Sequence, residues 1–414
     1  MPAESVCLTG AAQVLRPPED GLPFVRGDRA AELLLDPVSL TIAGGEIAAL
    51  EEAEAELRVD ASGCAVVPGF VDCHTHLPFA GWRAEEYERK VTGASYEEIA
   101  REGGGIASSA RAFAEATDAE VLDQGRSLAD EMLAWGTTSF ETKSGYGLSV
   151  DGELRALRLA GELDGAVRQT TASTALVAHA VPRGYTADSW MEEVEALVPR
   201  LTEQTRASAL DIYVESVAFS NEHLARMGEL AAGAGLALRC HVEQFHANRS
   251  VPVALEHGAR SVDHLACLHP DDVAPLAASE CAAVLLPGAE LMAAEQVAPG
   301  RELADAGAIC ALATDANPGT SPIVSIPLVM GLSVRRYGWS VREALLACTH
   351  NAAWVLGLAD RIGSIEVGKG ADLLLLDGPV EHLPYRLGHD PVLAVFRAGE
   401  VVHMREDAAP RFHG

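Results

Sequence analysis

Short apolar runs alternate with amphipathic stretches through the middle of the chain. Eight of these runs are predicted to be strands, at residues 69–73, 137–142, 174–178, 210–215, 237–240, 261–264, 282–286 and 310–314. Amphipathic segments between them are predicted to be helices, among them residues 119–135, 151–163 and 221–234. Because parallel strands need crossover connections, this alternation favours a parallel sheet covered by helices. Eight units over about 290 residues fit a TIM-like (β/α)8 barrel, which typically takes about 250.

Both ends of the chain carry shorter apolar runs that are separated by turn residues. Near the amino end the predicted strands are residues 6–8, 32–35, 38–42, 47–50 and 65–67. Near the carboxyl end they are residues 371–376, 392–396 and 401–402. Glycine and proline clusters at 17–21, 44–45 and 363–370 mark turns between these runs. We therefore expect one small β-sandwich domain, built from residues 1–67 and 361–414, beside a barrel at 68–360.

The charge of the chain argues against a nucleic-acid partner. Its 414 residues include 60 acidic and 31 basic ones, and the resulting net charge of −29 repels a phosphate backbone. The most apolar stretch, residues 281–294, is interrupted by Pro287, Gly288 and Glu290, so we expect no membrane span. The amino end lacks a secretory signal pattern, and the eight cysteines form no CxxC pair. We expect a cytoplasmic protein with reduced thiols and with neither nucleic-acid nor membrane partners.

Imidazole and carboxylate side chains follow several predicted strands, at the end of the barrel where active sites lie. The first strand ends in Asp72-Cys73-His74-Thr75-His76, and alternation along an extended chain places His74 and His76 on one side. Other strand ends carry His179, His241, His264 and Asp315. Converging donors of this kind suit one divalent ion, with zinc and iron the natural choices.

Several longer segments are characteristic: PGFVDCHTHLPFAGWRAEEYE, GASYEEIAREGGGI, ETKSGYGL and ATDANPGTSP, together with VAHAVP, SVDHL, GSIEVGKGADLLLLD and PVLAVFRAGE. In these segments the chain resembles the imidazolonepropionase family, which are amidohydrolases of histidine breakdown. The His-x-His element and GKGADLLLLD are common to many amidohydrolases, whereas SGYGL, the GASYEEIA…GGGI segment and ATDxNPGTSP are much narrower. The resemblance runs nearly end to end and implies a hydrolase with a small-molecule substrate and a homodimeric assembly.

The resemblance also implies a role for each matching residue. One divalent or trivalent ion, zinc or iron, would be held by His74, His76, His241 and Asp315, with His264 close to it but not a routine ligand. The substrate contacts would be Arg83, Tyr146, His179, Gln244 and Thr320, and the product contacts would be Asn317 and Gly319. Apart from the resemblance, the guanidinium of Arg83 suits a carboxylate, although an ion pair with Glu85 or Glu86 is the alternative.

The chemistry implied by the resemblance is hydrolytic ring opening of 4-imidazolone-5-propanoate to N-formimino-L-glutamate. Metal-bound hydroxide would attack the ring carbonyl, and the metal and His264 would stabilise the oxyanion. Asp315 would take the proton of the water and return it to the departing ring nitrogen. Gln244 is assigned to the catalytic site by the resemblance, although an amide cannot shuttle protons. Glu243 is therefore a second candidate, since a strand continuing past His241 would point it to the same side.

Lys143 raises the question of a second metal, because some amidohydrolases bridge two metals through a carboxylated lysine. The superfamily places that lysine at the end of the fourth strand, where this chain has Glu215, and Lys143 ends the second. We therefore predict a mononuclear site. Two alternative hypotheses stay open: another mononuclear amidohydrolase, either a heterocycle deaminase or a cyclic-amide hydrolase, and a catalytically silent binding barrel. Arg83, Tyr146 and the NPGTS segment argue against the first, and the intact ligand set argues against the second.

Overall fold

Eight parallel strands form the central sheet of the computed structural model, which describes residues 3–94, 98–99, 102–293 and 296–414. In chain order they are β8 (Phe70–Asp72), β9 (Thr137–Lys143), β10 (Thr170–Ala178), β11 (Ala207–Tyr213), β12 (Ala237–Val242), β13 (Ser261–His264), β14 (Ala282–Leu285) and β15 (Ile309–Leu312). Each strand pairs with the next one along the chain, so the prediction of eight parallel strands is confirmed. Part of the GASYEEIAREGGGI segment, at 95–97 and 100–101, lies outside the described residues.

The first and last strands meet just beyond their ends, which brings the sheet round into a barrel. The carboxylate of Asp72 accepts hydrogen bonds from Thr314 N at 3.0 Å and from Thr314 Oγ1 at 2.6 Å. Thr75 forms a parallel bridge with Ala316. The (β/α)8 fold class is therefore confirmed.

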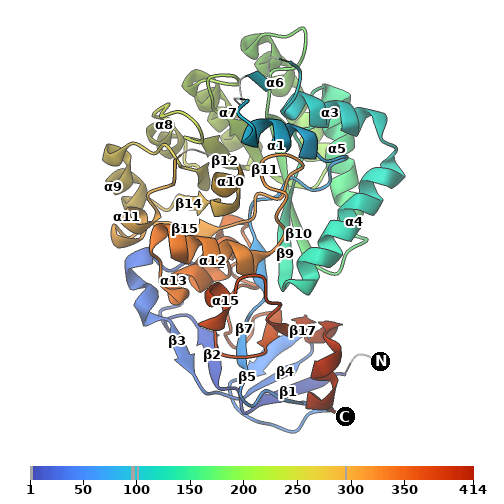
Figure 1. Ribbon diagram of the computed structural model, residues 1–414, viewed down its shortest axis with the longest axis vertical. Coiled ribbons are helices and arrows are strands. Elements are labelled where there is room, and N and C mark those ends of the chain that lie inside the picture. The colour runs from blue at the N-terminus through green and yellow to red at the C-terminus, as the bar shows by residue number, and fades with distance from the viewer. Residues whose placement is uncertain (1–2, 95–97, 100–101, 294–295) are drawn as a thin grey trace.

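Helices surround the barrel, as Figure 1 shows. They are α1 (Ala84–Val91), α3 (Ile106–Glu115), α4 (Asp118–Ala134), α5 (Val150–Asp164), α6 (Ala187–Gln204), α7 (Asn221–Ala234), α8 (Val251–Glu256), α9 (Pro270–Ala278), α10 (Pro287–Met292), α11 (Gly300–Asp305), α12 (Ile326–Tyr337), α13 (Val341–Ala347) and α14 (His350–Val355). The helices predicted at 119–135, 151–163 and 221–234 are confirmed as α4, α5 and α7. None of the described helices combines the length and the apolar character needed to cross a membrane.

The two ends of the chain come together in a small β domain below the barrel (Figure 1). One sheet has the strand order β19-β6-β1-β4-β5 and the other has the order β18-β17-β16-β7-β2-β3. From the amino end come β1 (Ser5–Thr9), β2 (Gln13–Arg16), the 3-10 helix η1 (Gly27–Glu32), β3 (Leu34–Asp36), β4 (Leu40–Ala43), β5 (Glu46–Ala49), β6 (Leu57–Asp60) and β7 (Ala65–Pro68). From the carboxyl end come β16 (Leu373–Leu376), α15 (His382–Tyr385), β17 (Val392–Arg397), β18 (Glu400–Met404), η2 (Glu406–Arg411) and β19 (Phe412–His413).

Pairing between β7 and β16 joins the two ends of the chain, because these strands run antiparallel with Leu374 opposite Val67. Successive residues of each strand point to opposite faces of the sheet, and the two faces pack against different hydrophobic cores. Val66 and Leu375 pack in the core of the small domain, whereas Val67 and Leu374 pack in the main core that includes the barrel. The β-sandwich built from both termini is thus confirmed, and one of its sheets also covers the barrel. The boundaries at 67/68 and 360/361 stay a prediction.

Candidate active site

His74 and His76 lie where the chain leaves β8 and runs beside the last strand. His74 O accepts from Asp315 N at 3.0 Å, and Ala316 O accepts from His76 N at 2.9 Å. This pairing extends the backbone, so alternate side chains face the barrel axis. Thr75 between them points the other way and donates to Glu141 O at 2.5 Å.

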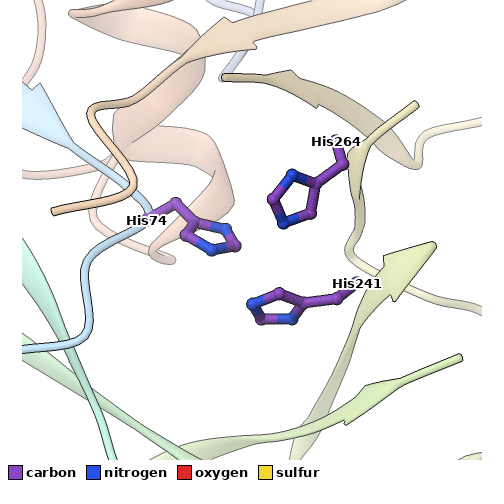
Figure 2. Close-up of side chains that lie close together, drawn as sticks. All are labelled: His74, His241 and His264. Carbon is purple, nitrogen blue, oxygen red and sulfur yellow. The ribbon is translucent and has the colours of Figure 1, made fainter. Parts of the chain in front are cut away.

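Five buried donor residues converge at this end of the barrel. The donor atoms of His74, His241 and His264 lie within 4.8 Å of one another, and so do those of His74, His76 and Asp315. Figure 2 shows the rings of His74, His241 and His264 pointing toward a common centre. His76 Nε2 lies 3.2 Å from Asp315 Oδ1 and 3.5 Å from His241 Nε2. All four predicted ligands, and His264 beside them, are therefore brought together.

Unsatisfied atoms within this group show that the donor set fits a cation. Among the described residues, His74 Nε2 and Asp315 Oδ1 are buried without a hydrogen-bond partner, and they face each other at 3.5 Å. A buried acceptor without a partner costs about 1–3 kcal/mol, and a shared cation removes that cost. Three imidazoles and a carboxylate form a donor set suited to zinc or iron.

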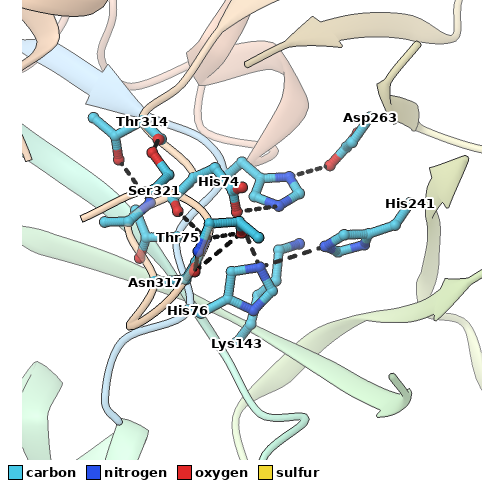
Figure 3. A network of polar contacts seen from close by, with 12 residues as sticks. His74, Thr75, His76, Lys143, His241, Asp263, Thr314, Asn317 and Ser321 are labelled. Atoms are coloured by element: carbon cyan, nitrogen blue, oxygen red, sulfur yellow. Dashed lines mark hydrogen bonds and ion pairs between the residues drawn. The ribbon is translucent and has the colours of Figure 1, made fainter. Parts of the chain in front are cut away.

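Two carboxylates fix the orientation of two of the predicted ligands. Asp263 Oδ2 accepts from His74 Nδ1 at 2.6 Å, as Figure 3 shows, and Asp211 Oδ1 accepts from His241 Nδ1 at 3.0 Å. Because a carboxylate only accepts, each Nδ1 carries a proton, and each Nε2 presents a lone pair when the ring is neutral. This is the tautomer that a metal ligand needs.

Burial sets the protonation of the histidines. It lowers the pKa of His76 and of His264 to about 3 and also lowers the pKa of His241, so these imidazoles are neutral. His74 differs: burial also opposes its charge, but the neighbouring carboxylates of Asp263 and Asp315 raise its pKa to about 9. Burial likewise favours neutral Asp315, yet its contacts with His74 and His76 hold its pKa well below the usual range. The site is therefore poised to exchange a proton for a cation.

One cavity connects these donors with the predicted substrate contacts. Its walls include His76, His241, His264 and Asp315, together with Arg83, Tyr146, His179, Gln244, Asn317 and Thr320. Ile106, Tyr213 and Phe245 also line it and were not predicted. Tyr213 ends the fourth barrel strand, so its position next to a strand end was the signal that could have identified it.

Gly319 supports Arg83 and is not among the residues that line this cavity. A Cβ built on Gly319 would lie 1.6 Å from Arg83 Nη2, so the guanidinium lies directly against the glycine backbone. Arg83 Nη1 donates to Ser109 Oγ at 3.1 Å, and Arg83 Nε lies 3.5 Å from Glu86 Oε2. Arg83 thus lines the cavity and also pairs with Glu86, while its contact with a substrate carboxylate stays a prediction.

Replacing Gly319 with alanine is expected to raise KM about tenfold or more and to change kcat less, because the new methyl group displaces the Arg83 guanidinium. Steady-state kinetics would measure the change. Gly161→Ala is the matched control, since a Cβ there meets nothing within 4 Å. A KM equal to that of the control would show that the position of Arg83 does not matter.

The loop after β9 holds Tyr146 and His179 in place. The Glu153 carboxylate accepts from Gly145 N and Leu148 N, each at 2.9 Å. Gly145 O accepts from His179 Nδ1 at 3.0 Å, which leaves His179 Nε2 as a hydrogen-bond acceptor. Gly145 has φ +113°, and a Cβ there would lie 2.8 Å from His179 Nδ1.

Asn317 organises the next loop. Its Oδ1 accepts from Gly319 N at 2.9 Å and from Thr320 N at 2.7 Å, while its Nδ2 donates to Asp315 O at 2.7 Å. Asn317 therefore connects the loop that supports Arg83 with the backbone of Asp315.

Gln244 and Glu243 point in different directions. β12 ends at Val242, and Glu243 has φ +54°, so strand alternation does not continue to this residue. The Glu243 carboxylate accepts from Ser250 N at 2.6 Å and Asn248 N at 2.8 Å, whereas Gln244 lines the cavity. The geometry therefore favours Gln244 as the residue that meets the substrate.

Lys143 lies at the end of the second barrel strand, as predicted. Its fully buried ammonium is 2.7 Å from Asp211 Oδ2 and 2.8 Å from Glu141 Oε2. The two carboxylate partners of Lys143 and the buried residues Arg239 and Asp263 were not predicted from the sequence. A charged residue inside a predicted apolar strand was the signal that could have identified all four.

Comparisons with known proteins identify the class. The family model described as the Amidohydrolase family matches residues 65–403. A 5-methylcytosine deaminase from Klebsiella pneumoniae is similar with a TM-score of 0.74 and 17% identity, covering 97% of this chain and 98% of that one. An adenosine deaminase from Xanthomonas campestris, solved with bound zinc, has a TM-score of 0.66 and 20% identity, covering 98% and 95%. At such identities the likeness shows the fold alone. Together with the family match, it defines an amidohydrolase.

Relatives found by sequence identify the family within the amidohydrolases. The imidazolonepropionase of Rubrobacter xylanophilus is 42% identical over 389 residues, which are 91% of this chain and 93% of the relative. That of Deinococcus radiodurans is 43% identical over 341 residues, 82% of this chain and 84% of the relative. The chain belongs to the imidazolonepropionase family. It is a hydrolase, and the family and the His/Asp donor set support a divalent metal ion.

Proposed function

We propose that the chain hydrolyses 4-imidazolone-5-propanoate to N-formimino-L-glutamate in histidine degradation. One observation carries the proposal: a single cavity holds a cation donor set together with the guanidinium of Arg83. The substrate offers a matching pair of groups, a ring carbonyl for the metal and a propanoate for the arginine. The relatives named imidazolonepropionase support the same substrate.

His74, His76, His241 and Asp315 would hold one ion per chain, zinc or iron. When bound, this ion supplies Lewis acidity and a hydroxide at neutral pH. Asp315 would have two roles, since its carboxylate would help to hold the ion and would also accept the proton of the attacking water. It returns that proton to the ring nitrogen that departs.

The remaining cavity residues bind and orient the substrate. His264 directs its one N–H toward the carbonyl oxygen and stabilises the negative charge that develops there. Arg83 binds the propanoate, while Tyr146, His179 and Gln244 contact the ring. Thr320 also contacts the substrate, and Asn317 and Gly319 contact the formimino group that the product retains.

A single ion per chain is supported by the place of Lys143. Its ammonium lies between the carboxylates of Glu141 and Asp211. These two carboxylates could otherwise bind a second metal ion, but the positive charge of Lys143 already lies between them. Metal analysis that finds two equivalents per chain would contradict a mononuclear site.

A reducing compartment fits the cysteines, and we therefore propose the cytoplasm. All eight are free and buried. The homodimer and the absence of a nucleic-acid partner, both expected from the sequence, stay predictions.

The test is to incubate the purified, metal-loaded protein with 4-imidazolone-5-propanoate. The ultraviolet absorbance of the substrate should decline, and the product should be N-formimino-L-glutamate. A metal-loaded protein that leaves this substrate untouched would overturn the substrate assignment. In that case a panel of cyclic amides and aminated heterocycles would identify which amidohydrolase reaction it performs.

Gln244→Ala is expected to raise KM about tenfold, because it removes a hydrogen-bonding group from the cavity wall. Glu243→Gln should instead lower the midpoint of thermal unfolding and leave KM close to the wild-type value, since the Glu243 carboxylate accepts from two backbone N–H groups of its own loop. Kinetics and thermal denaturation of both variants measure this. The reverse pattern would assign the substrate contact to Glu243.

A further inference from the structure

Five charged side chains form a buried layer on the inner side of the metal donors. They are Glu141, Lys143, Asp211, Arg239 and Asp263, from strands β9, β11, β12 and β13, and each is at most 1% exposed. Buried charges are costly unless they are paired and hydrogen-bonded. A barrel interior could be filled with aliphatic side chains instead, so the layer calls for a function.

Two arms of this layer end on the predicted metal ligands. In the first arm, Asp263 Oδ2 accepts from His74 Nδ1 at 2.6 Å and from Arg239 Nη2 at 2.9 Å. In the second arm, Asp211 accepts from His241 Nδ1 at 3.0 Å and from Lys143 Nζ at 2.7 Å. His74 and His241 are thus each oriented by a carboxylate, and each of these carboxylates is held by a cationic side chain.

Glu141 joins the two arms. Its Oε1 accepts from Arg239 Nη1, and its Oε2 lies 2.8 Å from Lys143 Nζ. Thr174 Oγ1 also donates to Oε1. The continuous chain of contacts runs through His74, Asp263, Arg239, Glu141, Lys143, Asp211 and His241.

We propose that Glu141 is a positioning residue for the metal site, acting through both arms on His74 and His241. It neutralises and orients Arg239 and Lys143, so that Asp263 and Asp211 stay aimed at the two Nδ1 atoms and both Nε2 lone pairs face the cation. Its negative charge also matters. With three carboxylates and two cationic groups the layer is net anionic, which favours a bound cation. This inference rests on the proposed metal ligands.

Replacing Glu141 with glutamine keeps the shape and removes the charge. The apo protein would be titrated with Zn²⁺ in competition with a chromophoric chelator, and circular dichroism would confirm the fold. The dissociation constant for Zn²⁺ should rise about 10- to 100-fold, the range known for residues behind metal ligands.

Glu290→Gln is the matched control. Glu290 is 5% exposed and accepts from Ala298 N at 3.0 Å and Tyr337 Oη at 2.8 Å, and within the described part of the chain no hydrogen bond or ion pair joins it to a predicted ligand. This variant should lower the midpoint of thermal unfolding without changing the affinity for Zn²⁺. The comparison separates loss of a buried carboxylate from loss of metal positioning.

A Zn²⁺ affinity of Glu141→Gln within about twofold of wild type, with reduced thermal stability, would overturn the inference and leave the layer a packing role. A wild-type protein that binds no Zn²⁺ or iron would instead overturn the proposed metal site. If Glu141→Gln does not fold, the Zn²⁺ affinity of Thr174→Val tests the inference in its place. This substitution removes one hydroxyl hydrogen bond to the same carboxylate and leaves the charge of Glu141 in place, and an affinity loss of about threefold is expected. Unchanged affinity in that variant would again overturn the inference.

Discussion

Replacing Asp315 with asparagine should lower kcat/KM about a thousandfold or more while the protein still folds. The carboxylate lies 3.2 Å from His76 Nε2 and 3.5 Å from His74 Nε2, at the centre of the donor set. The amide has nearly the same shape, so packing around this buried position is kept. An amide cannot accept the proton of the attacking water, however, and a positioned acid–base group contributes about 10²- to 10⁴-fold.

Turnover would be measured with excess metal, so that weaker binding by the amide does not account for the loss. Asp377→Asn serves as the control, because that residue lies in the small domain, where it pairs with His389 and Arg405. The control should keep the wild-type kcat/KM. Wild-type turnover by a metal-loaded Asp315→Asn variant would remove Asp315 from the proton route.

The barrel and the convergence of its donors could be predicted because both depend on local patterns. Apolar runs separated by amphipathic helices specify parallel strands, and a closed barrel brings every strand end to the same rim. His74, His241, His264 and Asp315 needed only to follow their strands for the structure to bring them together.

Strands of the small domain that lack a continuous apolar run could not be predicted from apolar runs. β6, Leu57–Asp60, has polar residues at alternate positions, and only Val59 of its four residues is fully buried. β2, which has two apolar residues between polar ones, and the two-residue β19 were missed because their apolar segments are so short. Residues 32–35, expected to be a strand, instead divide between the end of η1 and the start of β3. These elements depend on pairing partners far away in the chain, as β19 does on β6.

The remaining unpredicted features of the site depend on backbone angles and on contacts between residues far apart in the sequence. The direction of Glu243 depends on a positive φ that ends the alternation, and no pattern in the sequence encodes that backbone angle. The support of Arg83 by Gly319 joins loops that are more than two hundred residues apart, and it is visible only once the barrel closes. The contacts of the buried layer around Glu141 likewise form only when four barrel strands lie in the correct register, which the sequence does not reveal.

Removing the metal with a chelator should abolish hydrolysis, with a loss of about a thousandfold or more that Zn²⁺ or iron restores. Without the cation no hydroxide is available at neutral pH, and the ring carbonyl loses its Lewis acid. The fold should persist, because the ligand histidines keep their hydrogen bonds to Asp263 and Asp211. Thermal stability should nevertheless fall, since a ligand present at 100 times its Kd stabilises the native state by about 2.7 kcal/mol.

The measurement follows activity, metal content and the midpoint of thermal unfolding of the same sample before chelation, after it and after metal is added back. Restoration by one equivalent per chain separates removal of the metal from damage to the protein. It also determines which ion supports turnover, because zinc and iron can be added separately. Full activity in a sample that contains less than about one hundredth of an equivalent of metal would contradict the metal-dependent mechanism and would favour acid–base chemistry by the buried histidines alone.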